Sequence, residues 1–187
     1  MFKLSGNYCS SETKKKLPNF FVRIMPRVVA AERCSLFIYD PFAKKVWLKY
    51  GTSLEERAIE VSSEESIVGQ VITTGKSIIQ NDLEEFEGAH KQTDNTTGFI
   101  SRNIICVPIK SMDGTRITGA IQLLNKEGGE FSNADKDLLR ELASYLKKDV
   151  QKLFFRQKAG NLINRLQQLL NTDLSILFQT YKVAQQG

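Results

Sequence analysis

The sequence is poor in the residues from which metal and redox sites are built. It contains one histidine, His90, and three cysteines, Cys9, Cys34 and Cys106, with no closely spaced cysteine pair. Such a set cannot form a zinc site of the usual kind, although carboxylates alone could hold a hard cation. Cys34 and Cys106 each lie in a strand-like apolar run, where a free thiol usually serves as a small core residue. We therefore expect no metal and no cofactor.

Long hydrophobic runs are also missing, because charged residues interrupt every apolar stretch. The first residues, Met1 to Thr13, lack the apolar centre of a secretory signal. We expect no membrane insertion and a cytoplasmic location. The chain has 187 residues, of which 41% are hydrophobic and 25% charged. These values suit one folded domain with a helical extension.

The net charge of +5 raises the question of a nucleic-acid partner. The basic residues are not interleaved with aromatics, as a nucleic-acid platform would require. They lie along two expected helices, whereas Glu55–Glu65 and Asp82–Glu87 are acidic. We expect solvated helix faces and no nucleic acid.

Apolar spacing and turn residues predict the order of the elements. An amphipathic helix is expected at Leu17–Ala31, with its apolar face at Leu17, Phe20, Phe21, Ile24, Val28 and Ala31 and a bend or break at Pro26. A short helix is expected within Ser63–Gly75. Strands are expected at Cys34–Tyr39, Val46–Tyr50, Ser77–Gln80, Asn103–Ile109 and Ile117–Leu124, with a weaker candidate at Arg57–Val61. This order predicts an α+β fold in which helices pack on an antiparallel sheet.

Two connections are informative. Asp113-Gly114 is a strong hairpin signal between the last two strands. The polar segment Asp82–Gly98 is long for a structureless connection, and loops of that length in a compact domain are often functional.

The C-terminal part predicts long helices. Ser132 and Asp135 resemble an acidic capping box, and an apolar stripe follows at Leu139, Leu142, Leu146, Val150 and Leu153. A second seam comprises Ile163, Leu166, Leu170, Leu174, Leu177 and Tyr181. Asn171-Thr172-Asp173 favours an interruption of that seam. A partner helix and packing on its own domain explain the seam equally well. The expected divisions are an extension at residues 1–13, a domain at 14–158 and a linker helix at 159–187.

Four blocks carry a family resemblance. They read A-E-R-C-S-L-F-I-Y-D at Ala31–Asp40, I-V-G-Q-V-I-T-T-G-K at Ile67–Lys76, T-D-N-T-T-G-F-I-S-R-N-I-I-C-V-P-I at Thr93–Ile109 and G-A-I-Q-L-L-N-K at Gly119–Lys126. In order and spacing they resemble the GAF domains of cyclic-nucleotide phosphodiesterases and bacterial adenylyl cyclases. The resemblance implies a six-stranded antiparallel sheet, helices on one face, a ligand pocket on the other under a short helix and the long loop, and long terminal helices.

The family signature N-K, F and D-E is matched by Asn125, Lys126, Phe131 and Asp135, with Lys136 in place of the glutamate. The resemblance implies a structural ion pair between Lys126 and Asp135 that holds a loop over the pocket.

Cyclic-nucleotide-binding members of the family are similar to this chain at further positions. The implied ligand-binding residues are Ser35, Ile67, Val68, His90, Asp94, Thr97, Ser101 and Gln122. Some members carry a ligand-contacting glutamate at the position of Gln122, so the base preference stays open. A cyclic phosphate could be received by backbone N–H groups at the helix start Ser66–Gly69. The alternative is that Asp94 and Thr97 are turn residues that bond their own backbone.

A catalytic role is not expected. Some stand-alone GAF proteins reduce free methionine sulfoxide with cysteines in the long loop, but Asp82–Gly98 has none. A thioether-linked bilin needs a cysteine beside the loop histidine, whereas Ala89 and Lys91 flank His90. We hypothesise a regulatory sensor domain, homodimeric through its terminal helices, that binds cAMP or cGMP. The alternative is a GAF dimerisation module without a small-molecule site.

Overall fold

The computed structural model describes residues 20–41, 43–52, 60–61, 66–83, 91, 94 and 98–184. The described residues fall into two compact units, which divide between Gln151 and Lys152. The first unit holds a six-stranded antiparallel sheet with strand order β3-β2-β1-β6-β5-β4. The strands are β1 Ala31–Asp40, β2 Lys45–Gly51, β3 Glu60–Val61, β4 Ile78–Gln80, β5 Ile104–Lys110 and β6 Ile117–Lys126.

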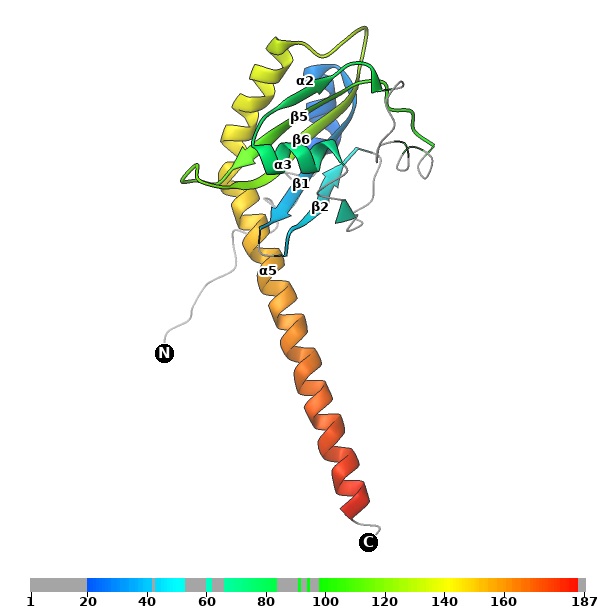
Figure 1. Ribbon diagram of the computed structural model, residues 1–187, viewed down its shortest axis with the longest axis vertical. Coiled ribbons are helices and arrows are strands. Elements are labelled where there is room, and N and C mark those ends of the chain that lie inside the picture. The colour runs from blue at the N-terminus through cyan, green and yellow to red at the C-terminus, as the bar shows by residue number, and fades with distance from the viewer. Residues whose placement is uncertain are drawn as a thin grey trace, which may run out of the picture. The chain divides into compact units, whose positions relative to one another are not determined.

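Helices cover both faces of the sheet. Figure 1 shows α3, Ile67–Thr74, on the near face and α2, Met25–Val29, on the far face. Phe37, Ala120 and Cys106 of the three central strands form a buried cluster with Val68, Val71 and Ile72 of α3. Side chains alternate between the faces of a strand, so the neighbouring strand residues face the other layer of helices. The predicted α+β class is confirmed.

Gly119 of β6 marks where the C-terminal helix α5, Asn133–Ala184, approaches the sheet. A Cβ atom at Gly119 would lie 2.3 Å from the carbonyl oxygen of Phe37 and 3.4 Å from a methyl of Val150. Leu139, Ala143, Leu146 and Val150 of α5 are buried. Leu139, Leu146 and Val150 of the predicted apolar stripe therefore pack on the sheet face opposite α3, together with Ala143.

The N-terminal helix differs from the prediction. It consists of a π-helical turn, η1 Phe20–Ile24, that passes directly into α2, and Pro26 lies in the first turn of α2, so the helix changes type next to the proline at which the sequence predicts a bend or a break. The predicted apolar face is wrong, because Ile24 and Val28 are 44% and 56% exposed whereas Met25 and Val29 are buried. The wider π turn shifts the helical phase, and Ala31 belongs to β1 instead.

The C-terminal helix is longer than predicted. The two expected helices, and the expected interruption at Asn171-Thr172-Asp173, are wrong, because α5 is continuous from Asn133 to Ala184. Its start is as predicted, since Ser132 Oγ accepts from Asp135 N and Asp135 Oδ2 accepts from Ser132 N. The expected domain borders stay predictions.

Other local predictions hold within the described residues. Ser66 caps α3 by accepting from Gly69 N, and Gly75 ends the helix with a φ of 67°. The Asp113-Gly114 turn joins β5 to β6. None of the described helices is both long enough and apolar enough to cross a membrane.

Candidate functional site

Two polar side chains lie opposite each other in the middle of the sheet. Ser35 of β1 is the register partner of Gln122 of β6, and Gln122 is in turn the partner of Cys106 of β5. Cys106 belongs to the cluster beneath α3, as do Phe37 and Ala120, two residues beyond Ser35 and two before Gln122. Ser35 and Gln122 therefore lie on the α3 face, beside an otherwise apolar cluster.

These two side chains have hydrogen-bonding capacity that the protein does not use. Ser35 is 8% exposed and Gln122 is half-buried. Among the described residues, neither the Ser35 hydroxyl nor the Gln122 amide takes part in a hydrogen bond. The polar atoms of Ser35 and Gln122 are not among the fully buried atoms without a partner, so they can bond water or a ligand that reaches this face.

The first turn of α3 covers the same face. Val68 is buried in the cluster, and Ile67 is half-buried against it. The Ser66 hydroxyl accepts from Gly69 N, which leaves the earlier backbone N–H groups of the turn without an intrahelical acceptor. Such groups favour an anionic ligand.

The end of the long loop is fixed by Asp94. Its carboxylate accepts hydrogen bonds from Ser101 N at 2.7 Å and Ser101 Oγ at 2.9 Å. Its backbone carbonyl accepts from Gly98 N at 2.8 Å. The structure thus brings together Asp94 and Ser101, two of the residues predicted for the site, and gives Asp94 the turn geometry that the sequence left as the alternative.

Arg33 extends the α3 face toward this loop. It lies two residues before Ser35 on β1, and its guanidinium carbon is 3.6 Å from the centroid of the Phe99 ring. Burial lowers the pKa of Arg33, and the nearby carboxylates of Asp94 and Glu32 oppose that shift. The segment at Phe99 is therefore stacked on the edge of the predicted ligand face. His90 and Thr97, also predicted for the site, lie outside the described residues.

The hydrogen-bonding role of Asn125 is not predicted by the sequence pattern. It is fully buried, has a φ of 58°, and donates from Nδ2 to Ile100 O at 2.8 Å and to Glu32 Oε2 at 2.9 Å. Its Oδ1 accepts from Arg102 N at 2.7 Å. In the sequence, the only signal for Asn125 is its match to the first residue of the family signature. Its side chain holds the end of the long loop.

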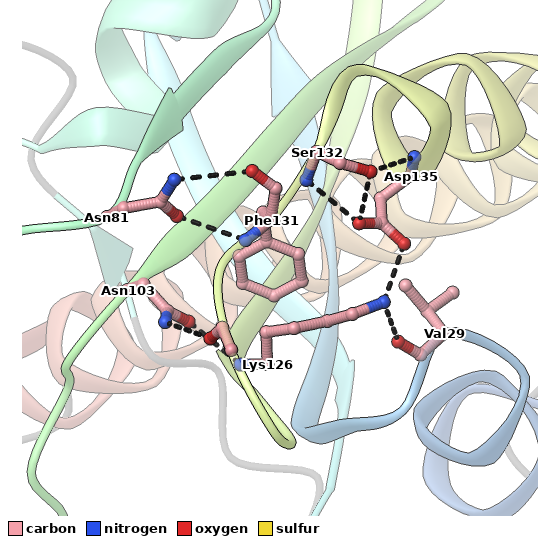
Figure 2. Close-up of polar contacts among 8 residues, drawn as sticks. Val29, Asn81, Asn103, Lys126, Phe131, Ser132 and Asp135 are labelled. Atoms are coloured by element: carbon pink, nitrogen blue, oxygen red, sulfur yellow. Dashed lines mark hydrogen bonds and ion pairs between the residues drawn. The ribbon is translucent and has the colours of Figure 1, made fainter.

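The ion pair implied by the resemblance is present. Lys126 Nζ lies 2.6 Å from Asp135 Oδ1 and donates to Val29 O at 2.7 Å, as Figure 2 shows. The pair was expected to hold a loop over the pocket. Among the described residues it joins the end of β6 to the end of α2 and the first turn of α5, and its role toward the loop stays a prediction. Within the described residues, the contacts to the segment that follows the loop come from Asn125, Glu32 and Arg33.

Two further asparagines fix the β6–α5 connection. Asn81, which follows β4, donates to Phe131 O at 3.2 Å and accepts from Phe131 N at 3.1 Å (Figure 2). Asn103 accepts from Lys126 N at 2.8 Å and donates to Gly129 O at 3.1 Å. Each amide side chain thus bonds one backbone N–H and one backbone C=O group that have no partner in a neighbouring strand.

The acidic residues of these contacts are held ionised. Desolvation opposes ionisation of Asp135, but hydrogen bonds from Lys126 and Ser132 outweigh it and lower its pKa. At Glu32 desolvation is likewise outweighed by hydrogen bonds from Asn125 and Arg102, so its pKa is also lowered. Both carboxylates therefore act as hydrogen-bond acceptors at neutral pH.

Nothing in the described part of the chain resembles a nucleophile or a metal site. Burial raises the pKa of the Cys34 and Cys106 thiols, which makes both poor nucleophiles. No group of three His, Cys, Asp or Glu side chains that could hold a metal ion occurs among the described residues. The geometry instead offers neutral hydrogen-bonding groups on an apolar floor, which suits recognition of a small molecule.

Comparison with known proteins identifies the class. The GAF domain family matches residues 19–147, which is more than half of the chain. The chain belongs to this family, whose members are regulatory sensor domains of signalling proteins.

Individual relatives agree with that assignment. The chain is 29% identical over 132 residues to a Caenorhabditis elegans protein named "Probable 3',5'-cyclic phosphodiesterase pde-5", covering 64% of this chain and 18% of the relative. The chain thus matches less than a fifth of that protein's length. The GAF domain of an Acinetobacter phosphoenolpyruvate-protein phosphotransferase superposes with a TM-score of 0.60 at 18% identity, covering 77% of this chain and 84% of that domain. A free methionine-R-sulfoxide reductase from Neisseria meningitidis gives a TM-score of 0.56 at 19% identity, covering 72% of this chain and 75% of its own. Both structures share the fold.

Proposed function

We propose that this chain is the sensor domain of a cytoplasmic signalling protein, that it binds cAMP or cGMP on the α3 face of the sheet, and that terminal helices relay the occupancy. The observation that carries the proposal is the register pair Ser35 and Gln122, two polar side chains on a mostly apolar floor for which no hydrogen bond is found within the described part of the chain. The phosphodiesterase name of the relative supports the same ligand class.

A cyclic nucleotide matches the chemistry of this face. A purine needs an apolar slot with a few hydroxyl or amide partners, which Ser35 and Gln122 would supply. Ile67, half-buried in the first turn of α3, would cover the ring together with Val68. The N–H groups of Ile67 and Val68, at the helix start Ser66–Gly69, would receive the single negative charge of the cyclic phosphate.

The long loop would form the lid of the site. Asp94, Thr97, Ser101 and His90 are proposed to face the ligand from this loop. Asp94 bonds Ser101 in the structure, so its contribution would include ordering the lid as well as contacting the ligand. The pocket itself stays a prediction, because most of the lid lies outside the described residues.

Titration calorimetry with both nucleotides tests the proposal. We expect binding by the wild-type chain with a dissociation constant below about 1 mM, equivalent to roughly 4 kcal/mol. Gln122→Ala should weaken binding at least about tenfold. Gln70→Ala is the matched control, since Gln70 is exposed on α3 and should leave affinity unchanged. Absence of binding by the wild-type chain would refute the ligand proposal.

The second candidate is a dimerisation module without a small-molecule site. It is favoured by a set of exposed apolar residues on α5 within the second unit: Phe155, Leu162, Ile163, Leu166, Leu169 and Leu170, each more than 50% exposed. Such a seam is typical of a helix that pairs with another helix.

Light scattering separates the two candidates when it is combined with the titration. The full chain should be a homodimer, and a chain ending at Lys158 should be folded and mainly monomeric. A monomeric full chain would contradict the proposed dimer. A dimer that binds neither nucleotide would favour the second candidate.

A further inference from the structure

The contacts around Asn125 have a role that neither the ion pair nor the predicted ligand residues explain. We propose that Glu32, Asn125 and Arg102 form a latch that positions the end of the long loop and couples it to the first turn of α5. The part of this inference that concerns ligand affinity rests on the proposed function. The latch itself does not, because it consists of contacts present without a ligand.

The three residues form a closed set of hydrogen bonds. Glu32, at the start of β1, accepts from Asn125 Nδ2 at 2.9 Å and from Arg102 Nη2 at 2.5 Å. Asn125 closes the set by accepting from the backbone N–H of Arg102 at 2.7 Å. The set therefore ties β1, β6 and the chain segment that leaves the loop.

Asn125 has no hydrogen-bond donor left for a ligand. An asparagine amide offers two N–H groups, and these donate to Ile100 O and Glu32, while its oxygen is used by Arg102 N. The side chain is also fully buried. Asn125 is thus a positioning residue, and its effect on a ligand would be indirect.

The latch continues into the terminal helices through the next residue. Asn125 N donates to Asn103 O at 3.0 Å, and Lys126 N donates to Asn103 Oδ1 at 2.8 Å. The Lys126 ammonium then contacts Val29 O of α2 and Asp135 of α5. Two adjacent residues of β6 therefore have different partners. Asn125 bonds the segment that follows the loop, and Lys126 bonds α2 and α5. A shift of the loop end would therefore be expected to disturb the contacts of Lys126 as well.

Charge makes the latch stronger than neutral contacts would. The bond between Arg102 and Glu32 is a charge-assisted one between half-exposed side chains. The lowered pKa of Glu32 keeps this carboxylate ionised in neutral solution. Glu32 also lies beside Arg33, which stacks on Phe99 two residues before Ser101.

Hydrogen exchange on the ligand-free chain tests the latch. Asn125→Gly removes the amide while tolerating the φ of 58° that other residues would find strained. We expect at least about tenfold faster exchange at Arg102 N–H and in the first turn of α5, relative to central β1 amides measured in the same sample. Asn81→Gly is the matched control: it should speed exchange near Phe131 and leave Arg102 unchanged.

Three results would overturn the inference. Unchanged exchange at Arg102 would show that Asn125 does not hold the loop end. Faster exchange at Arg102 with an unchanged first turn of α5 would refute the coupling. Equal acceleration of the central β1 amides would show a general loss of stability in place of a latch. If Asn125→Gly does not fold, Glu32→Ala at a half-exposed position is used, because it removes the acceptor of Asn125 Nδ2 and Arg102 Nη2. Unchanged exchange in this variant, both at residues 100–102 and in the first turn of α5, would refute the latch.

Ligand affinity provides a second test that is independent of hydrogen exchange. If the wild-type chain binds cAMP or cGMP, Asn125→Gly should weaken binding at least about tenfold although Asn125 touches no ligand. Normal affinity in that variant would refute the positioning role. If the wild-type chain binds neither nucleotide, the proposed function fails, and exchange alone decides whether the latch exists.

Discussion

Lys126 and Asp135 form an ion pair that joins the end of β6 to the first turn of α5, with Nζ 2.6 Å from Oδ1. The two side chains are 20% and 14% exposed, so each charge is largely removed from water. Lys126 also donates to Val29 O, and Asp135 also accepts from Ser132. Both terminal helices are therefore attached at one point.

Lys126→Met should destabilise the fold by about 2–3 kcal/mol, because it leaves Asp135 as a mostly buried carboxylate without its cation. Urea denaturation followed by circular dichroism measures the change. Lys110→Met, at an exposed position of β5, is the control and should change stability by less than about 0.5 kcal/mol. Equal effects of the two variants would contradict a structural role for the pair.

Stability should fall in acid because of Glu32 and Asp135. Their pKa values in the folded chain are lowered from the ordinary values of 4.5 and 3.8. The unfolded chain therefore binds more protons, and the stabilisation present above those values is lost as the pH falls through the lowered pKa values. Asp135→Asn should reduce the slope of unfolding free energy against pH below pH 3.8. An unchanged slope would show that Asp135 is not the group responsible.

Gly119→Ala should destabilise the chain by about 1–3 kcal/mol, since the added methyl would lie 2.3 Å from the Phe37 carbonyl oxygen and the backbone must shift. Thermal unfolding provides the measurement. At Gly129 a Cβ atom meets nothing within 4 Å, so Gly129→Ala is the matched control and should be near neutral. A neutral Gly119→Ala would contradict the close approach of β1 and β6.

Cys34 and Cys106 should resist alkylation in the native state. Both thiols are buried and burial raises their pKa, so little thiolate forms and reagents cannot reach it. Iodoacetamide labelling with peptide mass spectrometry should modify these two residues only under denaturing conditions. Rapid labelling of Cys106 in the native state would contradict its burial and would favour a redox role for this thiol.

Local patterns predicted most of the fold because each element carries its own signal. β1 and β2 follow apolar runs bounded by turn residues, and α3 lies between a Ser66 cap and Gly75. The start of α5 follows from Ser132 and Asp135, whose capping bonds depend only on neighbours in the sequence.

The errors arose where a local signal competes with a longer-range one. Pro26 predicted a break, but the π turn before it moved the buried face from Ile24 and Val28 to Met25 and Val29. In α5 the weak helix formers at Asn171-Thr172-Asp173 cost little per residue, and propagation of an existing helix exceeds that cost.

The candidate site was only partly predictable for a related reason. The strand pattern places Ser35 and Gln122 on strands, but their pairing is set by the register between distant segments. The same holds for Asn125. Its partners Glu32 and Ile100 are far away in the sequence, so its place in the latch can be seen only in the folded chain.

The most direct test of a ligand on the α3 face is to follow the side-chain amide signals of Gln122 and Gln70 by ¹⁵N NMR during titration with cAMP and cGMP. If a nucleotide binds beside Ser35 and Gln122, the Gln122 signals should shift to saturation with one of the two nucleotides. The signals of the exposed Gln70 should stay in place. Gln122 signals that do not move at saturating concentrations of either nucleotide would contradict the proposed site.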